Sequence, residues 1–520
     1  MRQAILITFA CFAVAGCSVN PKPMSRSELA FRADDYRLRV TANQEPLNGP
    51  VSLYEAMARA LKYNLDRRVE MMETALRGRE LKLARYDLLP RLVANGGYAG
   101  RNNYSGASSL SLLTKTQSLE PSTSSEREVF SADLQLSWDI LDFGLSYIRA
   151  KQAADEALIA EEQKRKVVNR IIEDVRTAYW RAVSSQRLTR KLRRLQGDVE
   201  RELAKSRDLE KREQTSPLTA LTFQRELVEI KQEIQRLDRE LYVAKLQLAA
   251  LMNLDPGKDF QISVPRRLNN AAVLSIKSRS EMVQIALENR PELREVAYRK
   301  RINEEEAQAA ILELFPSLKG YAGLNTDSND FLYNNDWISW GARASWNLIK
   351  VFSYPRRKAT IVAQDDLLDA RALALTMAVM TQVDVSRARY RFLRRELATS
   401  SEYYGIQKRI LDQIRAGAEA DTVSRQTLIR EEMNTLVAEV RYDIAYADLQ
   451  NAYAAIFTTI GLDPFGLDIS GEESVADLAR SLEALWASRG DRSARPWKRP
   501  VAARSNDTAG RSAEGAPAPN

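Results

Sequence analysis

The sequence predicts a mainly α-helical protein with a membrane β-barrel, arranged as an internal two-fold repeat of long helical hairpins and four strands. Three observations carry this prediction. Two stretches of alternating apolar and polar residues surround Trp138 and Trp346, which lie 208 residues apart. The motifs LMNLDP (251–256) and TIGLDP (459–464) are separated by the same 208 residues. Between these landmarks, apolar residues recur every three or four positions over long runs, as they do in coiled coils.

The composition excludes several classes of site. The 520 residues are 44% apolar and 28% charged, with a net charge of +8 and no histidine. Without histidine the chain lacks the commonest general base and the commonest metal ligand. Both cysteines, Cys11 and Cys17, lie in the first seventeen residues, so the body of the chain has no disulfide framework and no thiolate metal site. We therefore predict a protein that is not an enzyme and needs no metal or cofactor. The net charge does not require nucleic acid as a partner, because seven basic residues against three acidic ones lie in the tail 489–520, and no nucleic-acid binding is predicted.

The N-terminus is typical of an exported protein. Arg2 precedes an apolar run that is too short to be a stable membrane anchor, and this run ends in Val-Ala-Gly-Cys. These residues resemble the lipobox of bacterial lipoproteins. The resemblance implies a signal peptide over 1–16, a lipid such as palmitate on Cys17 at the start of a segment 17–50, and, because Ser18 follows, sorting to the outer membrane. An ordinary cleaved signal beside an incidental cysteine is the alternative.

Two offsets divide the remaining chain into halves. The stretch DLLPRLVANGGYAG (87–100) matches ELFPSLKGYAG (313–323) at an offset of 226 residues from proline to proline. The offset falls from 226 to 208 between the proline and tryptophan landmarks, so the first half has extra residues there. They lie in a Ser/Thr-rich run, 105–128, whose composition is typical of a loop. We predict a first repeat over 51–268, with a β-hairpin at 90–142 and a helical hairpin at 146–252, and a second over 269–468, with hairpins at 316–348 and 353–460. A short helix (469–488) and a disordered basic tail (489–520) follow.

Four strands are predicted, at 92–101, 130–141, 318–326 and 337–348. The second and fourth alternate strictly over the 10 to 12 residues of a tilted membrane strand. Their apolar faces direct Trp138, Trp340 and Trp346 toward lipid, near the strand ends, as in an aromatic girdle. Their polar faces direct Asp133, Gln135, Asp139 and Arg343 toward water in a barrel lumen. A soluble β-sandwich would use the same alternation, but four strands are few for one.

Four strands are too few to close a barrel. An open strand edge is not tolerated in lipid, so several copies of the chain must share one barrel. Three copies would contribute twelve strands, an even number within the usual range. Since no segment after the N-terminus has 18 consecutive apolar residues, no transmembrane helix is predicted.

The predicted helices have matched lengths. A run at 146–213, interrupted only by Gly197, gives about 100 Å of helix at ~1.5 Å per residue. Two shorter helices, 52–88 and 217–252, match it when they are stacked end to end. The second half repeats this arrangement, with a long helix at 353–419 and shorter ones at 279–314 and 422–458. A simple coiled-coil rod is not expected to match one long helix with two stacked shorter helices, and to do so in both halves of the chain.

The pattern resembles the TolC-like outer-membrane efflux and secretion channels. The motifs that carry the resemblance are VSLYEAMARALKYN, LLPRL, LSWDILDFG, ALENRPELREV, LFPSL, ASWNLI and the doubled LDP. The resemblance implies a homotrimer with a shared 12-stranded barrel in the outer membrane and a coiled-coil tunnel in the periplasm. Two departures are Leu65, where the second half has the proline of NRPEL, and the second strand-to-helix joint, which lacks the glycine that Gly144 provides in the first.

The resemblance also places function at the turns of the two helical hairpins, the periplasmic tips, where an adaptor protein docks and the aperture opens. In the first turn the expected residues are Glu213, Thr215 and Ser216, with Ser216 capping the next helix. In the second turn, within RAGAEADTVSRQTL (415–428), they are Arg415, Gly417, Glu419, Asp421 and Thr422. In a trimer any inward carboxylate becomes a ring of three that favours cations. A plain solvated turn in which Asp421 or Thr422 caps the next helix is the alternative.

The expected function is the exit duct of a tripartite export system. Such a duct passively conducts substrates from an inner-membrane transporter and its periplasmic adaptor across the outer membrane, with efflux of small molecules favoured. Type I protein secretion or polysaccharide secretion is the alternative for the same fold. A non-conducting, lipid-anchored periplasmic coiled-coil scaffold is the alternative of another class, and the alternating strands with their tryptophans argue against it.

Overall fold

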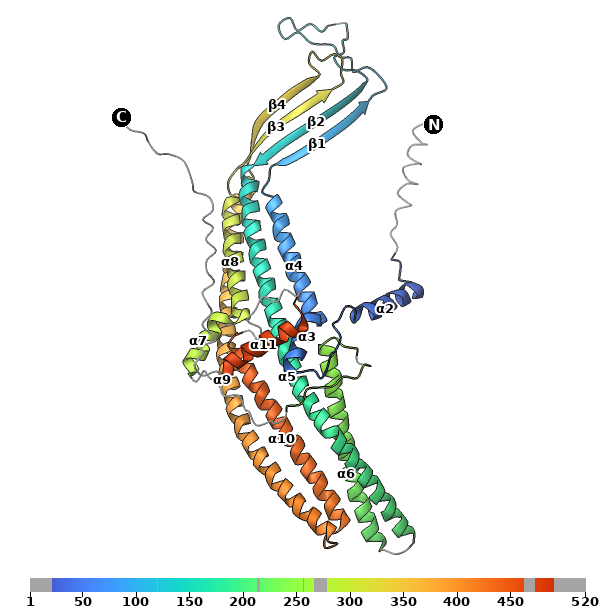
Figure 1. Cartoon of the computed structure of the whole chain (residues 1–520). Helices are drawn as coiled ribbons and strands as arrows, with labels where there is room; N and C mark the ends of the chain where they lie inside the picture. The colour runs from blue at the N-terminus through green and yellow to red at the C-terminus, as the bar shows by residue number, and fades with distance from the viewer. Residues whose placement is uncertain are drawn as a thin grey trace, which may run out of the picture.

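The computed structural model describes residues 21–118, 120–212, 216–255, 257–265, 278–462 and 473–490. The chain is elongated, with four strands at one end, helical hairpins at the other and short helices around its middle (Figure 1). The prediction of a mainly helical chain with four strands is confirmed. The predicted signal peptide, Cys17, Glu213, Thr215 and the tail from 491 onward lie outside the described residues. Within the described ranges, no helix is both long and apolar enough to cross a membrane.

Among the described residues, helices α3–α6 and α7–α10 form two sets with the same order and the same lengths. Helices α3 (Leu53–Tyr63) and α7 (Arg279–Asn289) have 11 residues, and α4 (Leu65–Tyr86) and α8 (Pro291–Leu312) have 22. Helices α5 (Ile140–Lys211) and α9 (Leu348–Glu419) have 72, and α6 (Pro217–Leu251) and α10 (Arg425–Thr459) have 35. The starts of α3 and α7 are 226 residues apart and those of α5 and α9 are 208 apart. The two sequence offsets therefore correspond to two sets of matched helices.

The predicted helices 52–88 and 279–314 are wrong as single helices, because each is broken into two. Asn64 takes an extended conformation, and its side chain caps α4 by accepting a hydrogen bond from the backbone N–H of Arg67. In the second half, Pro291 is the first residue of α8, where a proline ring fits but cannot continue the preceding helix. Leu65 occupies the same first position in α4. A cap and a proline thus produce the same break in the two halves.

The strand-to-helix joints lie earlier than the sequence predicted. Helix α5 begins at Ile140 and α9 at Leu348, so the predicted strand ends at 141 and 348 are wrong. Asp139 accepts hydrogen bonds from the backbone N–H groups of Leu141 and Asp142, and Asn347 accepts one from Ile349. A short polar side chain that satisfies free N–H groups is a strong helix start. The second joint therefore manages without a glycine because Asn347 caps it as Asp139 caps the first.

The four strands form one antiparallel sheet in the order β1-β2-β3-β4. They are β1 (Arg91–Gly100), β2 (Glu128–Asp139), β3 (Ser317–Asp327) and β4 (Asp336–Ser345). The register pairs Leu134 with Leu324 and Leu324 with Ile338, so the apolar residues of neighbouring strands share one face. Among the described strands, β1 and β4 each have a neighbour on one side only.

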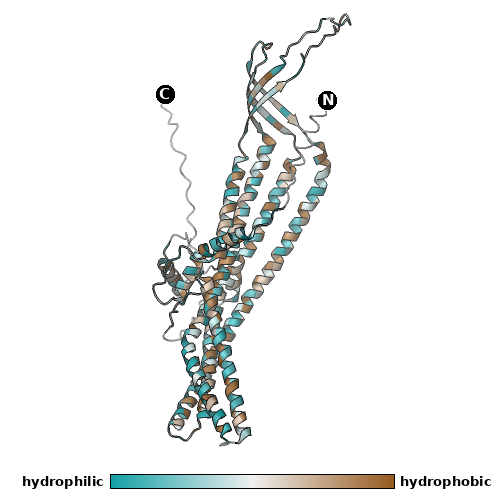
Figure 2. Ribbon diagram, turned by 90° about the vertical axis from the view of Figure 1, so that its right-hand side faces the viewer, coloured by the Kyte–Doolittle hydropathy of each residue, from teal (hydrophilic) through white to brown (hydrophobic). Residues whose placement is uncertain are grey.

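The helices form rows that repeat the order of the strands. Next to the sheet, α4 contacts α5, α5 contacts α8, and α8 contacts α9. Toward the other end, α6 contacts α5, α5 contacts α10, and α10 contacts α9 (Figure 1). Along these helices hydrophilic and hydrophobic residues are interspersed, as expected for packed amphipathic helices (Figure 2). Helices α5 and α9 run through both rows and connect the two ends of the molecule.

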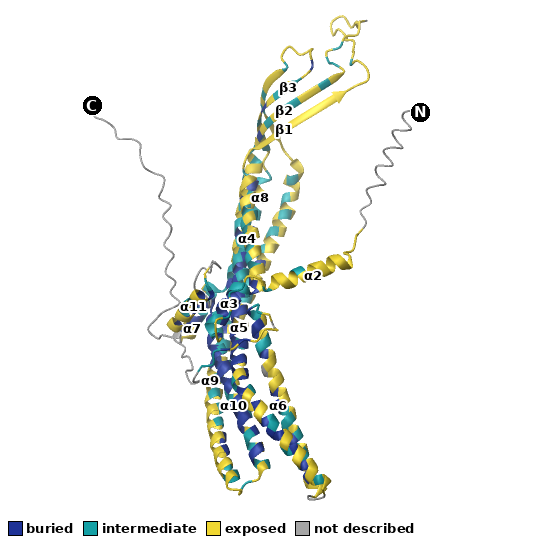
Figure 3. Cartoon of the chain, turned by 45° about the vertical axis from the view of Figure 1, so that its right-hand side comes forward, coloured by how far each residue is buried: buried dark blue, intermediate teal, exposed yellow. Residues whose placement is uncertain are grey.

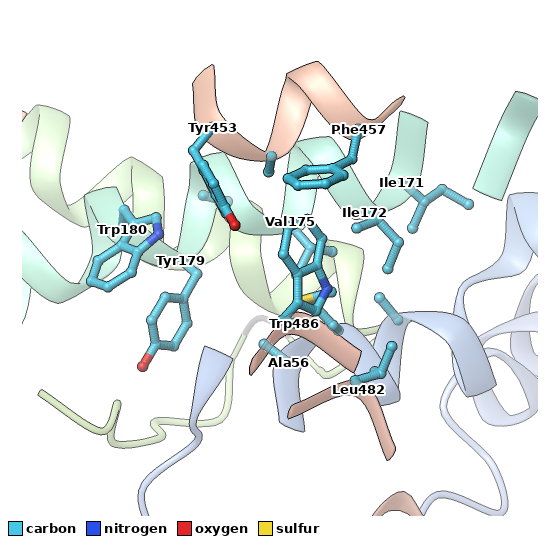
Figure 4. Packing of buried hydrophobic residues seen from close by; sticks show 14 of the residues in the cluster. Ala56, Ile171, Ile172, Val175, Tyr179, Trp180, Tyr453, Phe457, Leu482 and Trp486 are labelled. Atoms are coloured by element: carbon cyan, nitrogen blue, oxygen red, sulfur yellow. The ribbon is translucent and has the colours of Figure 1, made fainter. Parts of the chain in front are cut away.

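The main hydrophobic core lies at the middle of the molecule, where burial is concentrated (Figure 3). Here α3 packs against α5, α7 packs against α9, and the C-terminal helix α11 (Val475–Gly490) packs against α3. Aromatic rings pack edge to face here. The ring centroids of Trp180 and Tyr446 are 5.2 Å apart. Those of Phe457 and Trp486 are 5.9 Å apart (Figure 4). Helix α2 (Arg26–Val40) projects from this core and has no buried residue.

The doubled LDP motif marks the ends of α6 and α10. Asn253 and Gly461 follow these helices with φ angles of 57° and 74°. The next residue in each case, Leu254 or Leu462, donates its N–H back to the helix, at 2.8 Å and 2.9 Å. This left-handed helix ending satisfies carbonyl groups that would otherwise lack partners. The residue directly before LDP is therefore the one that takes the left-handed conformation.

Candidate functional site

The sheet has one apolar and one polar face. Residues that pair directly across an antiparallel sheet share a face, and Trp138 pairs with Gly320 while Trp340 pairs with Ala322. Both tryptophans are exposed, by 51% and 82%. The same face carries further exposed apolar side chains, namely Leu92, Tyr98, Phe130, Leu134, Leu136, Leu318, Leu324 and Ile338. So large an apolar surface left open in a single chain indicates contact with lipid or with another apolar surface.

The opposite face is mainly polar and internally hydrogen-bonded, with Val93 and Trp337 as its exposed large apolar side chains. Asn95 donates to the Asp133 carboxylate at 2.9 Å, and Asn325 donates to the Ser339 hydroxyl at 2.8 Å. Gln135 and Arg343, which the sequence assigned to this face with Asp133, lie on it as well. A sheet with these two faces can separate an apolar from an aqueous medium.

Two predicted barrel residues lie at the joints below the strands. Asp139 is the last residue of β2, where it caps α5 and also accepts a hydrogen bond from the Ser317 hydroxyl. Trp346 lies one residue beyond β4, so the prediction that it belongs to that strand is wrong. Its indole Nε1 donates to the backbone carbonyl of Leu314 at 2.9 Å, which ties the end of β4 to the end of α8. Both side chains hold a strand to a helix.

The turn between α9 and α10 is closed by backbone hydrogen bonds. Asp421 has a φ of 55°, Thr422 donates its N–H to the Gly417 carbonyl at 2.9 Å, and Asp421 donates to Ala418 at 3.3 Å. These two bonds form a Schellman ending, in which the left-handed position is usually glycine. The Thr422 hydroxyl also donates to the Gly417 carbonyl, at 3.0 Å.

The alternative that Asp421 or Thr422 caps the next helix is wrong. Ser424 caps α10, with its hydroxyl accepting from the Thr427 N–H at 3.2 Å. Asp421 thus shapes the turn through its backbone, while its carboxylate and that of Glu419 are exposed. Arg415 pairs with Glu432 across the hairpin at 3.0 Å. The turn accordingly presents two free acidic side chains on a fixed backbone.

The first hairpin turn is described only from Ser216 onward. Ser216 stands at the cap position and Pro217 at the first position of α6, as the sequence predicted. However, the Ser216 side chain forms no capping hydrogen bond. Within the described part of the chain, no group of three or more acidic or cysteine side chains is placed to hold a metal ion.

A seam between α5 and α10 joins the two helical hairpins. Its apolar part includes Leu188, Leu192 and Leu195 of α5 with Ile429 and Met433 of α10. Toward the middle of the molecule it becomes charged: Arg187 pairs with Asp443 at 2.5 Å, and Lys191 pairs with Glu439 at 2.6 Å. Toward the tip, Arg430 of α10 pairs with Glu226 of α6 at 2.5 Å. The seam therefore holds the α5–α6 hairpin against the α9–α10 hairpin through both apolar and charged contacts.

Comparison with known proteins identifies the fold. No protein-family model and no curated protein matches the chain. Among solved structures, the Campylobacter jejuni CmeC outer membrane channel matches with a TM-score of 0.64 at 13% identity, over 85% of this chain and 95% of that one. CusC, described for transmembrane channel formation, matches at 0.61 and 16%, over 86% and 100%. The Neisseria gonorrhoeae MtrE outer membrane channel in its open state matches at 0.60 and 15%, over 81% and 94%. This chain has the TolC-like fold.

The TolC-like fold was evident from the order of the motifs, but the charged seam was not. Arg187 and Lys191 are four residues apart on α5, as are Glu439 and Asp443 on α10, so each pair forms a row on one helix face. That spacing is the only signal in the sequence. It is common on solvated helices, and pairing these two rows required knowing that α10 packs on α5 in the TolC-like arrangement.

Proposed function

We propose that this protein is the outer-membrane channel and exit duct of a tripartite export system, with efflux of small molecules as its task. The observation that carries the proposal is the alignment of open edges. Strand β1 and helices α4 and α6 end their rows on one side, and β4 and α9 end theirs on the other. A chain with matching open edges at every level is suited to close into a ring with copies of itself.

Three copies in such a ring form the proposed homotrimer. Edge strand β4 of one copy pairs with β1 of the next, which gives a shared 12-stranded barrel without free edges. The helical rows close in the same way into a periplasmic tunnel. We treat the two halves as structural repeats, and because their helices have equal lengths, the wall of this tunnel is nearly uniform. Exposed apolar residues of α9, such as Leu373 and Met377, would then be covered by the neighbouring copy.

The two faces of the sheet support a place in the outer membrane. Trp138 and Trp340 lie on the face that meets lipid, and Asp133, Gln135 and Arg343 lie on the face that lines water. A lipid on Cys17 would add an anchor. Substrates pass through this lumen passively, because a channel needs only weak interactions with what it conducts.

The tips form the proposed docking and aperture region. In the second turn, Arg415, Gly417, Glu419, Asp421 and Thr422 meet the periplasmic adaptor of an inner-membrane transporter. Glu213, Thr215 and Ser216 do so in the first turn. The exposed carboxylates of Glu419 and Asp421 become rings of three in the trimer and favour cations at the aperture.

Conductance and oligomeric state test the proposal together. The full chain, purified in detergent, should have the mass of three copies and should produce discrete current steps in planar bilayers. Neutralising the aperture with Glu419→Gln and Asp421→Asn should lower its cation preference, while Glu396→Gln on α9, away from the tip, serves as the control. A monomer that gives no conductance contradicts the proposal.

A further inference from the structure

Two acidic residues of α10 are buried against two basic residues of α5. They lie at the end of the seam that is nearer the middle of the molecule. Asp443 is 2% exposed and Glu439 is 5% exposed. Arg187 reaches both carboxylates, at 2.5 Å from Asp443 and 3.4 Å from Glu439. Lys191 pairs with Glu439 at 2.6 Å. When all four side chains are ionised, the cluster holds two charges of each sign, and a proton on Asp443 leaves one positive charge in excess.

The cluster leaves one carboxylate oxygen without a partner. Oδ2 of Asp443 is fully buried and accepts no hydrogen bond, whereas Oδ1 is held by Arg187. A buried oxygen in this state favours the protonated acid, because ionisation places charge where water cannot reach. Burial accordingly raises the pKa of Asp443 to about 6, against the lowering effect of Arg187.

Other groups enclose the cluster from each packed element. Tyr404 of α9 hydrogen-bonds to Glu439, and its ring stacks on Tyr442 of α10 with centroids 5.9 Å apart. Burial raises the pKa of Tyr404 to about 12, so its hydroxyl stays protonated near neutral pH. The chain has no histidine, so no imidazole titrates beside Asp443. The groups that face Asp443 are thus Arg187 and Lys191 from α5, Tyr404 from α9, and Glu439 and Tyr442 from α10.

The cluster lies where the two hairpins contact each other, so any separation of the hairpins changes its surroundings. Parting the α5–α6 hairpin from the α9–α10 hairpin requires α10 to leave α5, which exposes Asp443 to water. Nearer the tip, the charged contacts between the hairpins are more exposed, as for Arg430 and Glu226, and such pairs contribute little to stability. Separation of the hairpins therefore changes the surroundings of Asp443 more than those of the exposed Arg430 and Glu226.

We propose that the Asp443 cluster is a pH-dependent latch, in which a proton on Asp443 holds the two hairpins together and loss of that proton favours their separation. The sign follows from linkage. The closed seam raises the affinity of Asp443 for a proton, while the parted seam returns it to the ordinary value of 3.8. Lowering the pH through about 6 therefore stabilises the closed seam, and raising it relaxes the latch. A proton that binds Asp443 with a pKa of about 6 in the closed seam and 3.8 in the parted seam favours the closed seam roughly 100-fold well below pH 3.8, and about tenfold at pH 5.

The distance between the hairpin tips tests the latch. Spin labels are attached to the full chain at Leu221→Cys on α6 and Thr422→Cys in the α9–α10 turn, with the natural cysteines replaced by serine. The labelled chain is diluted with unlabelled chain so that distances within one copy are measured. Pulsed electron resonance should show more parted hairpins at about pH 8 than at about pH 5.

Variants separate the latch from general effects of pH. Asp443→Asn mimics the protonated acid and should stay closed at both pH values, whereas Asp448→Asn on the same helix should respond as the natural chain does. Arg187→Gln removes the partner that favours ionisation, so its transition should move to higher pH. A tip distance in the natural chain that does not change with pH, or an unchanged response in Asp443→Asn, overturns the proposal. Neither readout depends on conductance, so failure here leaves the channel proposal standing.

Discussion

Gly461 lies directly against Asn289: a Cβ built on Gly461 would be 2.6 Å from the Asn289 carbonyl carbon. The joint between α7 and α8 thus rests on the backbone at the end of α10, and Arg290 donates to the Thr459 carbonyl there at 3.4 Å. In the first half, Asn64 donates to the Leu251 carbonyl at 3.2 Å. Both halves therefore fasten the break between their short helices to the last residue of the returning helix.

The first prediction is that Gly461→Ala destabilises the protein. Its φ of 74° costs a non-glycine residue about 1 kcal/mol, and the contact with Asn289 adds about 1–3 kcal/mol because backbone cannot move aside easily. Thermal or denaturant unfolding of the full chain measures the change. Gly405→Ala is the control, since this glycine lies within α9 with nothing near its missing Cβ, and alanine there should stabilise by up to about 1 kcal/mol. Equal effects of the two substitutions would contradict the assigned contact.

The second prediction concerns the α9–α10 turn. A Cβ on Gly417 would lie 2.6 Å from a methyl group of Val423, so Gly417→Ala should loosen the turn by about 1–2 kcal/mol. Val423→Ala should relieve most of the clash, because the contact under 3.0 Å is with the Val423 side chain and the Thr422 hydroxyl is 3.3 Å away. A double-mutant cycle of amide exchange in the turn measures the coupling. Asp421→Gly should instead stabilise the turn by about 1 kcal/mol by relieving its positive φ. Additive effects of the Gly417 and Val423 substitutions would argue against the contact.

The sequence was sufficient for the TolC-like architecture because the motifs repeat at two fixed offsets, 226 and 208, and the matched helices start at those offsets. It was insufficient at the joints. Alternation continues through Trp138 and Ile140, although Asp139 ends the strand by capping a helix, and periodicity alone does not register a cap. It was also insufficient for Asp443, whose burial depends on α10 lying against α5. Contacts between distant elements such as this one leave no local pattern in the sequence.

The third prediction is that the Asp139 cap stabilises the joint between β2 and α5. Asp139→Ala should cost about 1–2 kcal/mol, because it leaves the N–H groups of Leu141 and Asp142 without an acceptor and also removes the partner of Ser317. Asp139→Asn keeps an oxygen at the same place and should cost much less. Amide exchange in the first turn of α5 measures the loss directly. Equal protection in the alanine and asparagine variants would show that the cap contributes nothing.

The fourth prediction uses two neighbouring residues on opposite faces of β4 and rests on the proposed channel. Ile338 is 70% exposed on the apolar face and pairs with Leu324, whereas Ser339 lies on the polar face and accepts a hydrogen bond from Asn325. Ile338→Lys should weaken insertion into lipid by about 2–4 kcal/mol, because it places an ammonium group against hydrocarbon. Ser339→Lys places the same charge one residue away, where it meets water, and should insert normally. Folding into vesicles, followed by protease protection of the sheet, measures both variants. If the two lysines impair insertion equally, the faces of the sheet do not meet different media, and the sheet does not form the wall of a channel.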